Sequence, residues 1–283
     1  MVQSFRSPRL RRMIKNRWLY FLLVPGLLYF LVFKYAPMYG ALMAFKNYQP
    51  FLGFWDSQWV GFKHFERFFT EPAFWQLFRN TFLLAFYNIV FFFPAPILVA
   101  MLLNELNRQW FKRSIQAFLY IPHFMSWVVI IGIFFIFFAP ESGLVNKFLH
   151  MNGYEKWNVM ASKEWFRPMI IGQLLWKETG WNTIIFLAAL AGVNQEQYEA
   201  AQIDGANRWQ QAIHVTLPAI RSTIVILLIL RLGNFLDVGF EQIFLQLNQF
   251  NRSVGEVFDT YVYNVGISMG QMSYAAAVGL FKS

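Results

Sequence analysis

Long apolar runs, separated by short polar stretches, dominate the pattern of this chain. A helix needs about 20 predominantly apolar residues to cross the hydrocarbon layer of a bilayer. By that measure the pattern predicts six membrane-spanning helices, at 18–45, 80–103, 115–138, 169–191, 224–247 and 271 onward. The sixth run reaches Ser283 after about twelve residues, fewer than a span requires, so we expect a truncated last helix there.

The composition agrees with a lipid environment. Apolar residues make up 57% of the chain, aromatic residues 20% and charged residues 14%, whereas soluble domains carry about 45–50% apolar and about 25% charged residues. The fold class that we predict is therefore an all-α membrane protein. The chain has no cysteine, which excludes disulfides, thiol nucleophiles and cysteine metal sites.

Basic residues near the N-terminus predict the orientation. The first seventeen residues contain no acidic residue and six basic ones, Arg6, Arg9, Arg11, Arg12, Lys15 and Arg17. Such a cluster before the first span indicates a cytoplasmic N-terminus, so we predict a basic segment, 1–17, followed by a transmembrane domain, 18–283. The net charge of +9 then serves orientation and attraction to anionic lipid. Nucleic-acid binding is the alternative, and we expect no such partner.

The stretch 57–79, which alternation of the spans places outside, interleaves aromatic and charged residues. This pattern is typical of a helix lying at the membrane interface, and Pro72 should end one helix there and start another. A docking surface for an outside partner is the alternative.

Two of the expected spans carry polar faces. In the fourth span Gln173, Lys177 and Trp181 recur at every fourth position, with Trp176 beside them, while Glu178 and Asn182 point elsewhere. In the fifth span several polar residues would lie on one face of a continuous helix, within an arc of about 140° around its axis at 100° per residue. They are Arg231, Asn234, Asp237, Glu241 and Gln242.

Each ionised group at mid-membrane costs about 2.5–3.5 kcal/mol, so both faces should meet protein or a water-filled path. One interpretation is ion pairing that holds the helix bundle, for example Arg231 with Asp237 or Glu241. The other is a translocation path, which we favour for the set as a whole. Tryptophan beside amide and charged donors can bind a sugar, because the apolar face of the sugar ring stacks on the indole while the hydroxyls take hydrogen bonds. We hypothesise that Lys177 and Arg231 select anionic saccharides.

The expected cytoplasmic loop, 192–223, is predicted to form two short helices. Asn194 should cap the first helix, Gly205 should allow a tight turn, and Trp209, Ala212, Ile213 and Leu217 recur at helical spacing before Pro218. Two helices that meet at a thin corner could fit a groove on another protein. An amphipathic connector resting on the membrane is the alternative.

This loop resembles the coupling-loop motif of binding-protein-dependent importer permeases. In that motif E-A-A is followed by three intervening residues, a G, nine further residues and then I-x-L-P. Glu199, Ala200, Ala201 and Gly205 stand at the family spacing, as do Leu217 and Pro218, while Val215 takes the isoleucine position. By resemblance the residues that dock on an ATPase are Glu199, Ala200, Ala201, Asp204, Gly205, Ala206, Leu217 and Pro218.

Further stretches resemble the carbohydrate-uptake branch of that family. They include Phe74-Trp75 with Asn80-Thr81, Tyr120-Ile121-Pro122 and Asn234-Phe235-Leu236. Within the branch, Pro37-Met38-Tyr39-Gly40, Ala44-Phe45-Lys46, Pro122-His123-Phe124 and Gly239-Phe240-Glu241-Gln242 look like permeases for complex, often acidic oligosaccharides, of the alginate-oligosaccharide importer type. The resemblance covers nearly the whole chain, but the family's last span continues beyond Ser283.

The resemblance implies a type I transmembrane domain of an ATP-binding-cassette (ABC) importer, with about six transmembrane helices and a cytoplasmic coupling helix. It implies a bacterial inner-membrane permease that works with a second, homologous permease, two ATPase subunits and an extracytoplasmic solute-binding protein. The expected path residues are Gln173, Trp176, Lys177, Trp181, Arg231, Asn234, Asp237 and Glu241. We expect no cofactor in this chain, because ATP and Mg²⁺ would be bound by the ATPases.

Two other functional classes fit the sequence less well. The chain has no G-x-x-x-x-G-K-[ST] phosphate-binding sequence, so ATP energy would come from a partner. An intramembrane enzyme is disfavoured because His64, His123, His150 and His214 are scattered and no H-E-x-x-H or nucleophile-elbow sequence occurs. A channel or an ion-driven carrier would share the polar spans but would not need the coupling loop.

Overall fold

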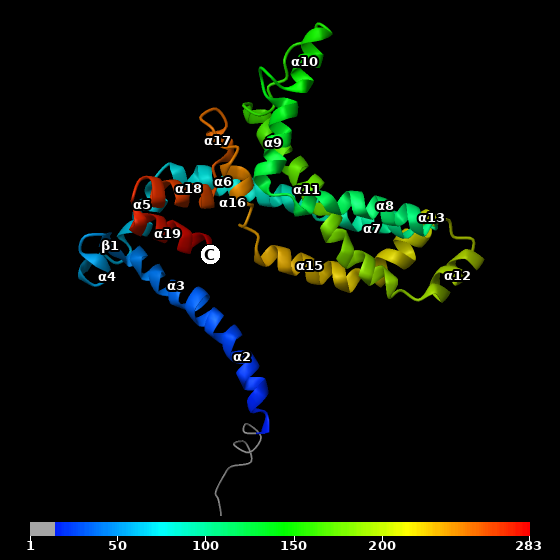
Figure 1. Ribbon diagram of the computed structural model, residues 1–283, viewed down its shortest axis with the longest axis horizontal. Helices are drawn as coiled ribbons and strands as arrows, with labels where there is room; N and C mark the ends of the chain where they lie inside the picture. Colours follow the sequence, from blue (N-terminus) through cyan, green and yellow to red (C-terminus); the bar gives the residue numbers. More distant parts are fainter. Residues whose placement is uncertain (1–14) are drawn as a thin grey trace, which may run out of the picture. The chain divides into compact units, whose positions relative to one another are not determined.

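The computed structural model describes residues 15–283, which fall into two compact units (Figure 1). The first unit runs to Glu71 and also contains Val262–Ser283, and the second unit is Pro72–Tyr261. Of the basic N-terminal cluster, Lys15 and Arg17 are described, whereas Arg6, Arg9, Arg11 and Arg12 lie outside the described residues.

The first unit begins with one helical run, Arg17–Phe45, which confirms the predicted helix at 18–45. It consists of α2 (Arg17–Phe30), a π-helical segment (Leu31–Tyr35), α3 (Ala36–Met38) and a 3-10 segment (Tyr39–Phe45). No residue in the most apolar stretch of this helical run is buried by other parts of the described chain. An apolar surface of this length needs lipid or another protein to cover it.

The remainder of the first unit is a small hairpin with short helices. The sequence did not predict the antiparallel strands β1 (Lys46–Gln49) and β2 (Ser57–Trp59). The helices are α4 (Gly53–Asp56), α5 (Lys63–Thr70), a π-helical segment (Asn264–Ser268) and α19 (Met272–Lys282). The chain end is tied to α5 and the hairpin, since the Tyr274 hydroxyl donates to Glu71 at 2.6 Å and the Tyr48 amide donates to Ser273 at 2.9 Å.

The second unit opens with a long helical run, Ala73–Asn104, directly after Pro72, as predicted for that proline. It comprises α6 (Ala73–Tyr87), a π-helical segment (Asn88–Phe92) and α7 (Pro94–Asn104). There follow α8 (Gln109–Tyr120), a 3-10 segment (Ile121–Phe124), α9 (Trp127–Phe138), α10 (Leu144–Met151) and α11 (Lys163–Ala191).

The chain continues through the predicted loop into shorter helices. These are α12 (Gln195–Ile203), α13 (Arg208–Gln211), a π-helical segment (Ala212–Thr216), α14 (Leu217–Ala219) and α15 (Arg221–Gly233). The last are α16 (Phe240–Phe244), α17 (Arg252–Gly255) and α18 (Phe258–Tyr263), which runs into the first unit. Figure 1 shows α12 and α13 beyond the ends of α7 and α8, away from α9 and α10.

The 29-residue helix α11 is the scaffold of the second unit, because it packs against α7 and α8. A Cβ on Gly180 would lie 2.0 Å from the carbonyl oxygen of Leu119 in α8, so only glycine permits this approach. Near its C-terminal end α11 buries Phe186 and Leu190 against Ile97 and Ala100 of α7. The polar residues of α11 are therefore held at fixed positions.

Within residues 15–283, two helical runs, Arg17–Phe45 and Ala73–Asn104, are long and apolar enough to span a membrane, and two bent pairs would raise the number to four. One pair is Gln109–Phe124 with Trp127–Phe138, bent by 102°, so the prediction of an uninterrupted helix over 115–138 is wrong. The break follows Pro122, and the Ser126 hydroxyl starts the new helix by accepting from the Val129 amide at 3.4 Å. With α11 and α19, these segments agree roughly with the expected six.

The predicted fifth span, 224–247, is also wrong as a single helix. The helix ends at Gly233 and resumes only at Phe240. Asn234 starts the interruption, and Gly239 adopts φ +92°, a left-handed conformation that few residues other than glycine take. The apolar segment instead extends in the other direction, as Arg208–Ala219 and Arg221–Gly233 with a bend of 63° between them.

Candidate functional site

A cavity of about 410 Å³ in the second unit brings polar side chains of two helices together. Glu178 and Asn182 line it from α11, and Arg231 and Asn234 line it from the end of α15. The remaining wall is apolar and comes largely from Phe92, Phe93, Pro96, Leu174, Phe186, Leu227 and Leu230. The cavity thus offers both charges and amide groups to a polar solute within otherwise apolar helices.

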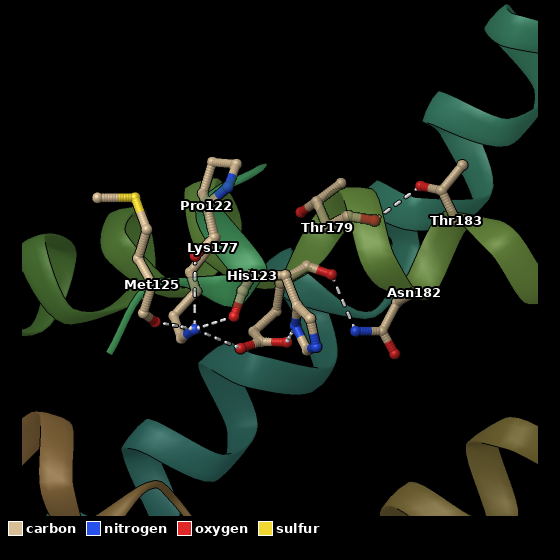
Figure 2. A network of polar contacts seen from close by, with 8 residues as sticks. Pro122, His123, Met125, Lys177, Thr179, Asn182 and Thr183 are labelled. Carbon is tan, nitrogen blue, oxygen red and sulfur yellow. Dashed lines mark hydrogen bonds and ion pairs between the residues drawn. The ribbon is translucent and has the colours of Figure 1, made fainter. Parts of the chain in front are cut away.

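The carboxylate of Glu178 is held by neighbouring side chains. Its Oε2 atom lies 2.8 Å from Nδ1 of His123, and its Oε1 atom lies 3.5 Å from Nζ of Lys177 (Figure 2). The His123 ring stacks flat on Trp181, with 4.5 Å between ring centroids and 2° between planes. Glu178 is therefore fixed in the cavity wall, and its position depends on the break between α8 and α9.

Lys177 stabilises that break. Its ammonium donates to the carbonyl oxygens of His123 at 2.6 Å and Met125 at 2.7 Å, and approaches that of Pro122 at 3.5 Å. Figure 2 shows these carbonyls converging on the ammonium. Lysine has three N–H donors, so the carbonyls and Glu178 take up its whole capacity. The side chain is only 8% exposed.

Gln173 belongs to a buried amide network rather than to the cavity wall. Its Oε1 atom accepts from Gln242 at 3.0 Å and from Gln246 at 2.9 Å, and its own amide donates to Gln246 at 2.8 Å. Gln242 also donates to the carbonyl of Ile170 at 2.8 Å. This network joins α11 to α16 and the residues after it, with the amides satisfied internally.

The side of α11 that lines the cavity is the one that the sequence analysis set aside. At 100° per residue, Glu178 and Asn182 lie about 100° and about 140° around the helix from Lys177, on a different face. Sequence reasoning therefore missed Glu178 and Asn182 as cavity residues, and it missed His123 as the partner of Glu178. The signal was present, because Glu178 and Asn182 are themselves four residues apart and form a polar stripe in an apolar helix.

Of the other expected path residues, Arg231 and Asn234 line the cavity, whereas Trp176, Asp237 and Glu241 are not part of its lining. Asp237 is exposed in the interruption after α15, and Glu241 is exposed in α16. The Asn234 amide donates back to the carbonyl of Leu230 at 3.1 Å and so caps α15. Trp176 is 41% exposed and lies beside Phe134, at 6.1 Å between ring centroids.

The predicted coupling loop forms the expected pair of helices. The Asn194 side chain caps α12 by accepting from the Glu196 amide at 3.0 Å, as predicted. The turn after α12 has Gly205 at φ +79°, also as predicted. Asn207 and Gln210 then start α13 with a reciprocal capping box. The corner is therefore a defined turn and not a disordered connection.

The same corner presents an uncovered surface. Glu199, Ala200, Asp204, Gly205 and Pro218 are exposed, while Ala201, Ala206 and Leu217 are half-buried. Two large apolar side chains stand beside them, Ile203 at 87% exposure and Trp209 at 72%. Large apolar groups left uncovered next to a thin corner are typical of a protein-docking surface.

Two contacts hold this corner against the rest of the second unit. Arg208 of α13 pairs with Glu105, which follows α7. The hydroxyls of Tyr198 in α12 and Thr216 lie 3.0 Å apart. These contacts join α13 to the end of α7 and α12 to the segment that leads, through Pro218 and Ile220, into α15.

Chemically, the cavity can bind and orient a polar solute by hydrogen bonds and charge. Across residues 15–283, no group of three or more histidine, aspartate or glutamate side chains could hold a metal ion. Glu178 pairs with a histidine that is itself stacked on an indole, an arrangement that positions the carboxylate.

Comparison with known proteins agrees with these features. Protein LplB of Bacillus subtilis is 56% identical over 269 residues, which cover 95% of this chain and 85% of the relative. The polygalacturonan/rhamnogalacturonan transport system permease protein YteP of the same organism is 51% identical over 278 residues, covering 98% and 87%.

Solved structures show the same fold. A crystal structure of a bacterial ABC transporter involved in the import of the acidic polysaccharide alginate matches with a TM-score of 0.88 and 38% identity, covering 96% of this chain and 91% of that one. A second crystal structure, of a bacterial alginate ABC transporter in complex with an alginate pentasaccharide-bound periplasmic protein, also gives 0.88, at 37% identity and the same coverage.

The type I importer transmembrane fold follows from this similarity, and the relatives are transporter permeases, not enzymes. The family model described as "Binding-protein-dependent transport system inner membrane component" matches residues 92–281. This match includes α11, the four polar residues of the cavity and the coupling loop. The chain therefore belongs to the family of inner-membrane components of binding-protein-dependent transport systems.

Proposed function

We propose that this chain is the permease subunit of an ATP-driven importer for acidic oligosaccharides in a bacterial cytoplasmic membrane. The substrates named for YteP and for the alginate transporter are both polymers of uronic acids. The observation that carries the proposal is the cavity in which Arg231, Asn182 and Asn234 surround a fixed carboxylate, Glu178. Guanidinium and amide groups are the donors that carboxylates and hydroxyls require.

The translocation path would run along this cavity. Arg231 and Asn234 would meet the sugar directly, and Trp176, Trp181, Asp237 and Glu241 are exposed enough to line other stages of its passage. Gln173 and Lys177 are buried in polar networks, so they would act by holding the elements around the path. This assignment modifies the hypothesis that Lys177 itself selects anions.

The coupling loop, 192–223, would dock in a groove of an ATPase subunit. Glu199, Ala200, Ala201, Asp204, Gly205 and Ala206 would form the inserted corner, and Leu217 and Pro218 would join it to α15. Two ATPase subunits would bind ATP and Mg²⁺, and this chain would hold neither. When the two ATPase subunits close on ATP, their movement would be transmitted to the cavity through α13 and α15.

A second, homologous permease would complete the membrane domain. The uncovered helical run Arg17–Phe45 supports this expectation, since apolar surface of that extent must be covered. A solute-binding protein would deliver the sugar from the outer side. The basic segment 1–17 would lie in the cytoplasm and precede the transmembrane domain, 18–283.

The test is uptake by cells that lack the gene for this chain, with and without its expression from a plasmid. The substrates are a labelled oligogalacturonate and a neutral maltooligosaccharide of equal length. Restored uptake of the acidic sugar alone supports the proposal. If the plasmid restores only neutral sugar uptake, or neither, the proposed substrate class is wrong.

A further inference from the structure

We infer that Arg167 is a carboxylate-binding residue at a second cavity of the same path, where it receives a uronate group of the incoming oligosaccharide. This inference rests on the proposed function and adds a residue that determines substrate specificity.

The second cavity measures about 560 Å³ and lies between the N-terminal half of α11 and the π-helical segment after α6. Its charged and polar lining consists of Lys163, Glu164, Arg167 and Tyr87. Phe91 and Pro168 supply flat apolar surface, against which the apolar face of a sugar ring can pack. Two cations face one carboxylate, Glu164, which already accepts from the Ser162 hydroxyl at 2.5 Å.

Arg167 is held in place but not satisfied. Its Nη2 atom donates to Oδ1 of Asn80 at 2.8 Å. The Asn80 amide in turn donates to the carbonyls of Ser253 at 3.1 Å and Glu256 at 3.0 Å, so its orientation is fixed. The Nε atom of Arg167 is buried and has no hydrogen-bond partner within the described chain.

A buried guanidinium donor without an acceptor is unusual in a native protein. It indicates that the acceptor is a group that comes and goes. The guanidinium of arginine presents parallel N–H donors whose geometry fits the two oxygens of a carboxylate. Asn80 accepts from Nη2 and so fixes the orientation of this group. The anion that the site would take is therefore a carboxylate of the kind that uronic acids carry.

The two cavities lie along one side of α11. Pro168, Ile171 and Leu175 line the second cavity, and Glu178 and Asn182 line the first. At 100° per residue these five positions fall within an arc of about 80°. The opposite wall is also continuous in sequence, since Phe91 lines one cavity and Phe92 the other. This continuity favours a saccharide passing along α11 over a lipid resting at one end.

The test compares Arg167→Gln and Arg167→Lys with wild type in the complete importer, reconstituted with its partner subunits and binding protein. Lys147→Gln is the matched control, because it removes an exposed cation of α10 that lines neither cavity. Initial uptake is measured below saturation for an oligogalacturonate and for its methyl ester, which lacks the charges. For each sugar, the uptake rate of a variant is divided by the uptake rate of wild type. The preference of the binding protein for one sugar therefore cancels from the ratio.

We expect Arg167→Gln to lower uptake of the acid by about tenfold or more, the usual effect of losing a charge-assisted hydrogen bond. Uptake of the ester should change less than about twofold, Arg167→Lys should be intermediate, and Lys147→Gln should change either sugar by less than about twofold. Equal loss of both sugars would overturn the inference by assigning Arg167 a structural role. Unaltered uptake of both, or recovery on adding anionic lipid, would overturn it as well.

Failure of the proposed function has a different signature. In that case wild type itself imports neither the acid nor its ester, and the inference falls with it. When wild type imports the acid and Arg167→Gln does too at the same rate, only the role of Arg167 is wrong.

Discussion

Replacing Lys177 by methionine should loosen the break between α8 and α9. Methionine keeps an unbranched side chain but leaves the carbonyls of His123 and Met125, now bound at 2.6 and 2.7 Å, without their donor. It also removes the ammonium group that lies 3.5 Å from the Glu178 carboxylate. A hydrogen bond to a charged group contributes about 1.5–3 kcal/mol, and removing one partner of a buried pair costs about 3–5 kcal/mol.

Because the side chain is 8% exposed, water cannot readily replace these contacts, and we expect a loss of about 3–5 kcal/mol in the free energy of unfolding. For a chain of this size the unfolding temperature should fall by about 10 °C. Thermal unfolding in mild detergent, followed by tryptophan fluorescence, measures this change. Lys163→Met, at the exposed start of the same helix, should leave the unfolding temperature unchanged.

The same variant separates two roles for Lys177. If it holds the break, Lys177→Met should lower the transport of the oligogalacturonate and of its methyl ester alike, together with stability. An unchanged unfolding temperature combined with selective loss of acidic-sugar uptake would refute this reasoning. That result would show that the ammonium reaches the substrate.

Three further predictions concern the coupling corner, the scaffold and the cavity. Gly205→Asp should abolish ATP-driven uptake while the complex still assembles, because it forces a side chain and a charge onto an exposed turn at φ +79°; wild-type uptake in this variant would contradict the coupling assignment. Gly180→Ala should sharply reduce folded protein, since its Cβ would lie 2.0 Å from a backbone oxygen. Gly172→Ala in the same helix meets nothing within 4 Å and should accumulate normally; equal yields by size-exclusion chromatography would argue against the close packing of α8 and α11. Arg231→Ala should lower uptake of the oligogalacturonate about tenfold or more and leave uptake of its methyl ester nearly unchanged, and equal effects on both sugars would remove Arg231 from substrate recognition.

The elements that the sequence predicted well depend on local signals. The apolar run before Lys46 forms the expected helical run, and Pro72 separates two helices as predicted. The coupling loop was predicted in most detail, because Asn194 and Gly205 act through their own backbone geometry. The residue types at a cap or a tight turn therefore predict its local structure directly.

The breaks within apolar segments were harder to predict. Apolar residues recur throughout 224–247, yet the helix stops at Gly233. The turn residues Asn234 and Gly239 could have signalled this, but a hydropathy pattern averages over them. The bend after Pro122 depends equally on Lys177, which lies more than fifty residues away in the sequence. Its ammonium donates to the carbonyl oxygen of His123 at the bend. Such a long-range contact leaves no mark in the local pattern.

The face of α11 illustrates a third limit. Periodicity finds two polar stripes on this helix, one with Lys177 and one with Glu178, but it does not say which stripe meets the cavity. That choice is made by the packing of α7, α8 and α15 around α11. The sequence could predict which polar residues share one face of α11. The assignment of Glu178 and Asn182 to the cavity required the tertiary structure.

The most direct test of the central claim is sugar flux in sealed proteoliposomes that contain this chain with its partner permease and ATPases. Substrate-loaded binding protein is added outside, and either ATP with Mg²⁺ is enclosed or an ion gradient is imposed. Our account predicts that labelled oligogalacturonate accumulates only with enclosed ATP and that Gly205→Asp abolishes this accumulation. Accumulation driven by an ion gradient without ATP would contradict it.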